Sequence, residues 1–262
     1  MGVQGKTSER LKGQEAPEGA DAALTPPSGD LTSVAYERIE ELFVSLRLAP
    51  GSTLRTQDLQ GLTGLGRTPV HQAVRRLAAE TLLDVQPRNG LLVSPIDLAR
   101  ERRLADLRRD MDRFVVGAVI SEMEGNERAR LYHIMRRLED QQPTITLDQF
   151  NVLDKAFDRL MIEASRERFL ERSLRPLKAL GRRAGFLDIS KVSGQQGLEE
   201  TVENHLAIMR AVLAGDVALA RTMSDRLVEF GLVMLDRLER NIDPALLDIS
   251  FGLDEGPGGR AS

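Results

Sequence analysis

The sequence contains no cysteine and no tryptophan, and only 4% of its 262 residues are aromatic. The lack of cysteine excludes disulfides, zinc fingers and thiol catalysis. The scarcity of aromatic side chains argues against a protein that binds single-stranded nucleic acid by stacking. No apolar run reaches membrane-spanning length and no signal-peptide core is present, which predicts a cytoplasmic protein with no membrane partner. Glycine-rich phosphate loops and Ser-His-Asp sets are also missing, so we expect no enzyme of those classes.

The chain divides into two composition classes. Its first 30 residues and residues 243–262 are rich in glycine, proline and polar residues, which predicts a disordered N-terminal arm and a flexible tail. Between them, hydrophobic periodicity indicates two folded segments, residues 31–96 and 97–242. The net charge of −4 does not exclude a nucleic-acid partner, because binding depends on local patches of charge.

The first segment contains a basic amphipathic helix in the stretch TGLGRTPVHQAVRRL, residues 63–77. Pro69 suits the first helical position and Thr68 can cap the helix, so we expect the helix to begin there. One face is a narrow apolar stripe of Val70, Ala73, Val74 and Leu77. The opposite face presents donors, with Arg67 just ahead of the helix: His71, Gln72, Arg75 and Arg76.

The surroundings of this helix predict a winged helix-turn-helix. Residues 35–46 and 56–62 have helical apolar spacing, and Gly64 and Gly66 make a tight turn into the basic helix. The following stretch LLDVQPRNGLLV predicts two strands joined at Arg88-Asn89-Gly90, because glycine tolerates the positive φ of a tight hairpin. Basic residues gather at the recognition helix, its lead-in and the wing.

The second segment has no strand pattern. We expect helices at about 98–123, 127–140, 147–165, 167–185, 197–214 and 216–240, so the fold class is mostly α, with an N-terminal winged helix-turn-helix and a C-terminal all-α helical bundle. Five ionisable residues fall inside apolar stripes on four of these helices: Arg108, Asp154, Asp158, His205 and Arg226. Burying an unpaired charge is costly, so we expect these side chains to share one polar pocket.

The stretch LRLAPGSTLRTQDLQGLTGLGRTPVHQAVRRLAAETLLDVQPRNGLLVSP resembles the DNA-binding domain of the GntR family of bacterial transcription regulators, without a gap. The resemblance implies a transcription repressor that binds a double-stranded, palindromic operator as a homodimer. It places the DNA contacts at Arg55, Arg67, Thr68, His71, Gln72, Arg75, Arg88, Asn89 and Gly90. Gly66, His71 and Gln72 depart from the family's usual Ser, Arg and Glu, so the base preference is expected to be unusual.

The helical segment resembles the FadR-type effector domain in its metal-associated subgroup, through LADLRRDMD, LDKAFDRLMIEAS and ENHLAIMRAVLAGDVALARTM. The resemblance implies a divalent metal, such as zinc, nickel or manganese, on Asp154, His205 and two further histidines. Here Asp158 and Arg226 stand at those two histidine positions. Two alternatives follow: Asp154, Asp158 and His205 hold the metal, or Arg226 and Arg108 balance the aspartates without one.

The interpretation that accounts for both segments is a ligand-responsive regulator. Its effector is expected to be a small anionic metabolite, a carboxylate held by Arg108 or Arg226, in the pocket with Asp154, Asp158 and His205. The alternative is a helical metallohydrolase that uses Asp154, Asp158 and His205 around a metal-bound water. That alternative leaves the winged helix unexplained. An architectural DNA binder without a ligand leaves the buried charges unexplained.

Overall fold

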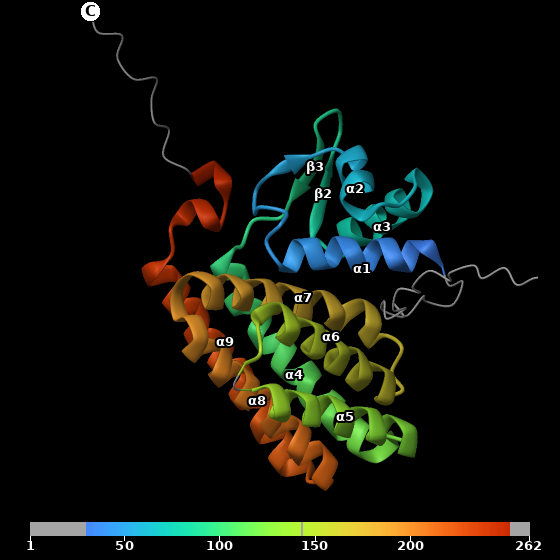
Figure 1. Ribbon diagram of the computed structural model, residues 1–262, viewed down its shortest axis with the longest axis vertical. Helices are drawn as coiled ribbons and strands as arrows, with labels where there is room; N and C mark the ends of the chain where they lie inside the picture. The colour runs from blue at the N-terminus through green and yellow to red at the C-terminus, as the bar shows by residue number, and fades with distance from the viewer. Residues whose placement is uncertain (1–29, 143, 252–262) are drawn as a thin grey trace, which may run out of the picture. The chain divides into compact units, whose positions relative to one another are not determined.

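The computed structural model describes residues 30–142 and 144–251, and confirms the predicted fold class (Figure 1). The N-terminal part contains α1 (Leu31–Val44), β1 (Thr53–Leu54), α2 (Thr56–Thr63), α3 (Arg67–Ala79), β2 (Leu83–Gln86) and β3 (Gly90–Val93). The C-terminal part contains α4 (Leu98–Glu122), α5 (Gly125–Gln141), α6 (Leu147–Ala164), α7 (Leu170–Asp188), α8 (Gly194–Ala214) and α9 (Val217–Asn241). The predicted arm, apart from Asp30, lies outside the described residues.

The winged helix-turn-helix is held by an apolar core to which α1, α2, α3 and the small sheet contribute, together with Ala179 and Leu180 of α7. The sheet has the order β1-β3-β2 and is antiparallel throughout. Gly90 opens β3 with a φ of +92°, and a Cβ there would lie 2.6 Å from the carbonyl oxygen of Leu54. Glycine is therefore required at the end of the wing for two reasons: the left-handed backbone and the close approach of β1. The sequence predicted β2 and β3 but missed the two-residue strand β1.

The recognition helix α3 begins two residues earlier than the sequence predicted. Its N-cap is Gly66, and the helix runs from Arg67, so neither Thr68 nor Pro69 marks its start. Proline is tolerated anywhere in the first turn, because the amides there have no partner within the helix. Gly66 supplies no capping side chain, and its extended backbone (φ −68°, ψ 169°) is accessible to any residue.

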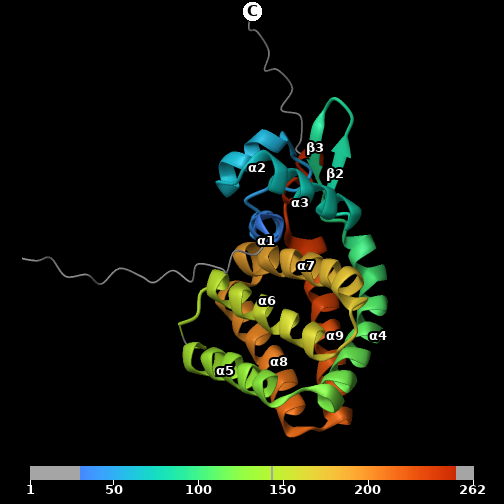
Figure 2. The same ribbon diagram turned by 90° about the vertical axis from the view of Figure 1, so that its right-hand side faces the viewer.

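The six long helices of the C-terminal part form a bundle in which α4 and α9 lie side by side (Figures 1 and 2). Apolar side chains from α4, α5, α6, α7 and α8 form one continuous core with α9. A π-helical turn, Ile189–Ser193, joins α7 to α8 and was not predicted. Among the described residues, none of the helices has the combined length and apolarity needed to span a bilayer.

The predicted flexible tail is ordered at its beginning. Residues 243–251 contain two short 3-10 helices, Pro244–Leu246 and Ile249–Phe251. The amide of Ile96 donates to the carbonyl of Leu247 at 2.8 Å, and the amide of Ile249 donates to that of Pro50 at 3.0 Å. These bonds fix the segment beside the linker between the two parts, so the expectation of flexibility is wrong for residues 243–251. Residues 252–262 lie outside the description.

Candidate functional site

The winged helix presents the predicted DNA-facing side chains to solvent. On α3, Val70, Ala73, Val74 and Leu77 are buried, while the other face is exposed: Arg67, Thr68, His71, Gln72 and Arg75. Arg55, Arg88 and Asn89 are also exposed, and Gly90 is half-buried. Gln72 accepts a hydrogen bond from Thr32 at the start of α1 (2.5 Å). One face of α3 is therefore buried in the core, and the opposite face exposes hydrogen-bond donors to solvent, as the apolar stripe predicted.

Arg76 does not belong to this exposed face. Its Nε donates to Glu80 at 2.9 Å and its Nη2 lies 3.3 Å from Glu171 of α7. Its guanidinium also stacks over the ring of Tyr36, 4.1 Å from the centroid, and Arg175 of α7 stacks on that ring at 4.3 Å. Arg76 therefore ties the recognition helix to α1 and α7, which corrects its assignment to the donor face.

The helical part contains a polar cavity of about 70 Å³, lined by residues of α4, α6, α7, α8 and α9. Four of the five predicted pocket residues lie on its wall: Arg108, Asp154, Asp158 and His205. The fifth, Arg226, is exposed on α9 and is not part of the lining. The buried face of α9 runs through Ala220, Ser224 and Leu227, so Arg226 lies beside that face rather than within it. The placement of Arg226 inside the pocket is wrong.

Two cations from α7, Lys178 and Arg182, make the contacts with Asp158 that were expected of Arg226. Arg182 donates from Nη1 to Asp158 at 2.6 Å, and Lys178 lies 3.2 Å from the same carboxylate. Lys178 also lies 2.9 Å from Asp112 of α4, which accepts from Nε of Arg108 at 3.2 Å. The sequence analysis missed Asp112, Lys178 and Arg182. Lys178 and Arg182 follow Arg175 at helical spacing, and that stripe was the signal that could have identified them.

The residues that line the cavity include more cations than carboxylates. Burial raises the pKa of Asp158; Lys178 opposes this rise and the neighbouring Asp154 adds to it. Burial would also raise the pKa of Asp112, but Lys178 and Arg108 hold it below its ordinary value. With His205 protonated, the lining cations are Arg108, Lys178, Arg182 and His205, and the lining carboxylates are Asp154 and Asp158. Asp112 and Glu40 contact Lys178 and Arg182 from outside the lining.

His205 has both ring nitrogens engaged by acceptors. Nδ1 lies 2.7 Å from the carbonyl oxygen of Thr201, and Nε2 lies 3.0 Å from Oδ1 of Asp154. A carbonyl and an ionised carboxylate both accept, so each nitrogen must carry a proton and the ring is an imidazolium. Burial alone would lower the pKa of His205, but the charge and hydrogen bond of Asp154 raise it. Burial would raise the pKa of Asp154, and His205 lowers it instead.

This arrangement does not suit a metal. A histidine ligand needs a ring nitrogen with a free lone pair, and both nitrogens of His205 carry protons in hydrogen bonds. Asp158 is already neutralised by Lys178 and Arg182. Within residues 30–142 and 144–251, no group of three or more His, Asp or Glu side chains is placed to hold a metal ion. The donor set therefore favours the alternative in which cations of the chain balance the aspartates, and it offers no metal-bound water to a hydrolase.

We expect removal of divalent metal to leave the protein unchanged. Protein purified without added metal should contain less than about one-tenth equivalent of zinc, nickel or manganese by elemental analysis. Incubation with EDTA should not shift its melting temperature, since a metal that bound only the folded state would stabilise it. A stoichiometric metal together with a chelator-induced drop in melting temperature would restore the metal alternative.

The Asp154–His205 pair should make stability depend on pH in a specific direction. The pKa of His205 is raised by folding, so its contribution is complete below about 6.5, its unfolded value, and disappears as the pH rises through the folded pKa. His205→Gln should therefore be destabilising at pH 6 by urea unfolding, with a smaller difference from wild type at pH 9. His133→Gln, on the exposed face of α5, is the matched control. A pH-independent difference for His205→Gln would show that the ring is not charged.

A buried ion network joins the winged helix to the wall of this cavity. Glu40 of α1, only 1% exposed, lies 2.5 Å from Lys155 and 3.2 Å from Arg175. Arg182, which holds Asp158 on the cavity side, is also 3.9 Å from Glu40. Burial would raise the pKa of Glu40, but Lys155, Arg182 and Arg175 lower it to about 2. One guanidinium thus connects the cavity carboxylate to α1.

Comparisons with known proteins agree with both parts of this description. The profile of bacterial regulatory proteins of the gntR family matches residues 31–93, and that of the FCD domain matches residues 103–230. An HTH-type transcriptional regulator from an unstable DNA locus of Streptomyces ambofaciens is 30% identical over 71% of this chain and 77% of its own length. The chain belongs to the GntR family.

Other relatives of this GntR-family regulator align with most of its length. The HTH-type transcriptional repressor RspR of Escherichia coli K12 is 24% identical over 83% of this chain and 94% of its own length. The structure of E. coli McbR/YncC has the same fold, with a TM-score of 0.69 at 19% identity, over 80% of this chain and 98% of that one. The protein is thus a transcription regulator with an FCD effector domain.

Proposed function

We propose that this protein is a homodimeric repressor that binds a short palindromic operator and is released, or rearranged on the DNA, by a small carboxylate in the cavity of the helical part. The observation that carries the DNA-binding half is the exposed polar face of α3, whose opposite face is buried. Arg67 and His71 on that face are assigned to base edges in the major groove. Arg75 and the wing at Arg88 and Asn89 are assigned to the backbone or the minor groove.

The effector half rests on the charges of the polar cavity. Lys178 and Arg182 are almost completely buried there, and Arg108 is partly exposed within the space. Guanidinium groups bind carboxylates with strong, directional hydrogen bonds. A ligand carboxylate near Arg182 would compete with Asp158 for that cation, which also lies 3.9 Å from Glu40 of α1. Ligand binding and the position of α1 would thereby be coupled.

Dimerisation is supported by exposed apolar side chains on the helical part. Leu107 and Phe114 lie two turns apart on one face of α4, with exposed fractions of 49% and 52%. Side chains of this size are usually covered when they form a patch. A single winged helix makes too few contacts for tight site-specific binding, whereas two copies read a palindrome.

The proposed function is tested by selecting DNA from a random duplex library with the full-length protein. We expect the enriched sequences to share an inverted repeat of two half-sites about one helical turn apart. Selection without any shared sequence, or of a motif without two-fold symmetry, would contradict the proposal.

We expect the protein to be a dimer at micromolar concentration in light scattering, and Phe114→Asp to be a monomer. A charge in an apolar interface is left without water or a partner, which should weaken association at least tenfold. Val152→Asp, on the exposed side of α6 (66% exposed), is the matched control and should remain dimeric. A monomeric wild-type protein would overturn the dimer assignment.

A further inference from the structure

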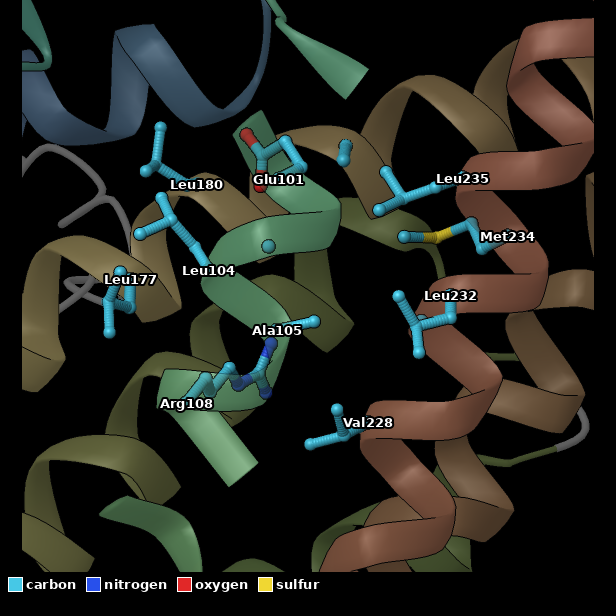
Figure 3. Close-up of a pocket in the computed structure, with 13 residues that line it drawn as sticks. Glu101, Leu104, Ala105, Arg108, Leu177, Leu180, Val228, Leu232, Met234 and Leu235 are labelled. Atoms are coloured by element: carbon cyan, nitrogen blue, oxygen red, sulfur yellow. The ribbon is translucent and has the colours of Figure 1, made fainter. Parts of the chain in front are cut away.

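A second cavity of about 60 Å³ lies beside the polar one and is bounded by α4, α7 and α9 (Figure 3). Its lining is mostly aliphatic: Leu104, Leu177, Leu180, Val228, Leu232 and Leu235. The side chains of α9 point toward α4 in Figure 3, and two charged residues of α4, Glu101 and Arg108, stand at different levels of the same wall. None of the sequence-based assignments apart from Arg108 involved this cavity.

The two cavities share four lining residues: Arg108, Gly181, Gly231 and Met234. Two of these have no side chain, and the other two have long, flexible ones. A Cβ at residue 231 would meet no heavy atom within 4 Å, whereas one at residue 181 would lie 2.6 Å from Nη1 of Arg108. The wall between the two cavities therefore consists of two flexible side chains, Arg108 and Met234, and two glycines, which have no side chain to fill the space.

The glycine at 231 is not explained by packing. Glycine in the middle of a helix costs about 1 kcal/mol relative to alanine, and Gly231 is an interior residue of α9. No neighbour requires the absence of its Cβ. At Gly181 the reason is visible, because the missing side chain lets the guanidinium of Arg108 lie across α7. Both glycines thus open the junction of the two cavities.

Arg108 is the donor at this junction. Its Nε is held by Asp112, while neither Nη atom donates a hydrogen bond to another residue in the described part of the chain. On the side of the polar cavity, Arg108 is one of the lining cations, which outnumber the lining carboxylates. On the other side begins the aliphatic lining. A carboxylate at Arg108 would therefore have polar partners at one end and apolar surface at the other.

We infer that the two cavities form one site for a monocarboxylic acid with an apolar chain, its carboxylate at Arg108 and the polar cavity, its chain in the aliphatic cavity. This inference rests on the proposed function and names the class of effector. Burial raises the pKa of Glu101 to about 7. Above that pH the site selects against dicarboxylic acids of similar length, because a second carboxylate at the far end of the chain would meet the ionised Glu101 in a largely apolar lining. Like charges in such surroundings are strongly unfavourable.

The test is a series of straight-chain acids titrated into the full-length protein by calorimetry: acetate, butanoate, hexanoate and octanoate, with hexanedioate beside hexanoate. We expect affinity to rise about three- to fourfold per methylene until the aliphatic cavity is filled, which corresponds to about 0.8 kcal/mol per buried CH2. At pH 8, where Glu101 is ionised, hexanedioate should bind at least tenfold more weakly than hexanoate, and Glu101→Gln should reduce that difference.

Gly231→Leu places a side chain in the junction. The open space at residue 231 and the better helix propensity of leucine predict that the variant folds, with a melting temperature no lower than that of wild type. Octanoate should lose at least tenfold in affinity in this variant while butanoate loses less than threefold, and Gly231→Ala should give a smaller loss for octanoate. Affinity that is independent of chain length in wild type, or equal losses for both acids in Gly231→Leu, would overturn the inference and leave the proposed function intact. If none of the acids binds, the proposed carboxylate effector itself fails.

Discussion

Arg182→Met is expected to lower the free energy of unfolding by about 3 kcal/mol. Arg182 lies 2.6 Å from Asp158 and 3.9 Å from Glu40, and the exposed fractions of these three side chains are 7%, 10% and 1%. Removing one partner of a buried ion pair leaves the other charge without compensation, which typically costs about 3–5 kcal/mol. The lower end applies here because Lys178 still faces Asp158 and Lys155 still faces Glu40.

The matched control is Arg226→Met. Arg226 was assigned by sequence to the same balancing role, but it is exposed on α9. Substitution of an exposed side chain usually changes stability by less than about 0.5 kcal/mol. Urea unfolding of the two variants at pH 7 distinguishes the assignments. A large loss in Arg226→Met with little effect in Arg182→Met would show that the sequence-based assignment was right and the structural one wrong.

Arg67→Ala is expected to weaken binding to the selected operator by about 1–3 kcal/mol, or roughly five- to 150-fold, without altering the fold. Arg67 is the first residue of α3 and is exposed, so its replacement removes donors and leaves no cavity. If Arg67 reads a base, the loss should be greater on the operator than on random duplex DNA. If it contacts only phosphate, the loss should be equal on both.

Arg240→Ala is the control for this second variant. It removes one exposed cation near the end of α9, in the helical part, and should change DNA affinity less than twofold. Fluorescence anisotropy at a fixed salt concentration gives both comparisons, because protein–DNA affinity depends steeply on salt. An Arg67→Ala variant with unchanged operator affinity would mean that the exposed face of α3 is not the recognition face.

The winged helix was predictable because its determinants are local. The stripe of Val70, Ala73, Val74 and Leu77 fixes which face of α3 is buried, and the glycine of the hairpin fixes the wing. The predicted start of α3 was two residues too late. The capping argument favoured Thr68, whereas the N-cap is Gly66, which has no side chain that could identify it as a cap in the sequence. The two-residue strand β1 is too short to show any alternation.

The cavity was only partly predictable because it depends on packing between helices. Apolar stripes placed Asp154, Asp158 and His205 on buried faces, and all three line the cavity. Arg108 also lines it, although Leu107 and Phe114 of the stripe used to place it are exposed. Successive helical residues are about 100° apart, so a residue at the edge of a stripe, such as Arg226, is easily assigned to the wrong side. The helical spacing of Arg175, Lys178 and Arg182 indicates a basic face on α7, but the packing of α6 against α7 decides that Lys178 and Arg182 contact Asp158.

In the proposed function, the cavity of the helical part controls DNA binding by the winged helix. Operator affinity of the full-length protein, measured by fluorescence anisotropy with and without an acid that raises its melting temperature, tests this most directly. We predict that saturating acid changes the affinity at least tenfold, within the range of coupling found between linked sites. An acid that binds the cavity and leaves operator affinity unchanged at saturation would contradict the claim.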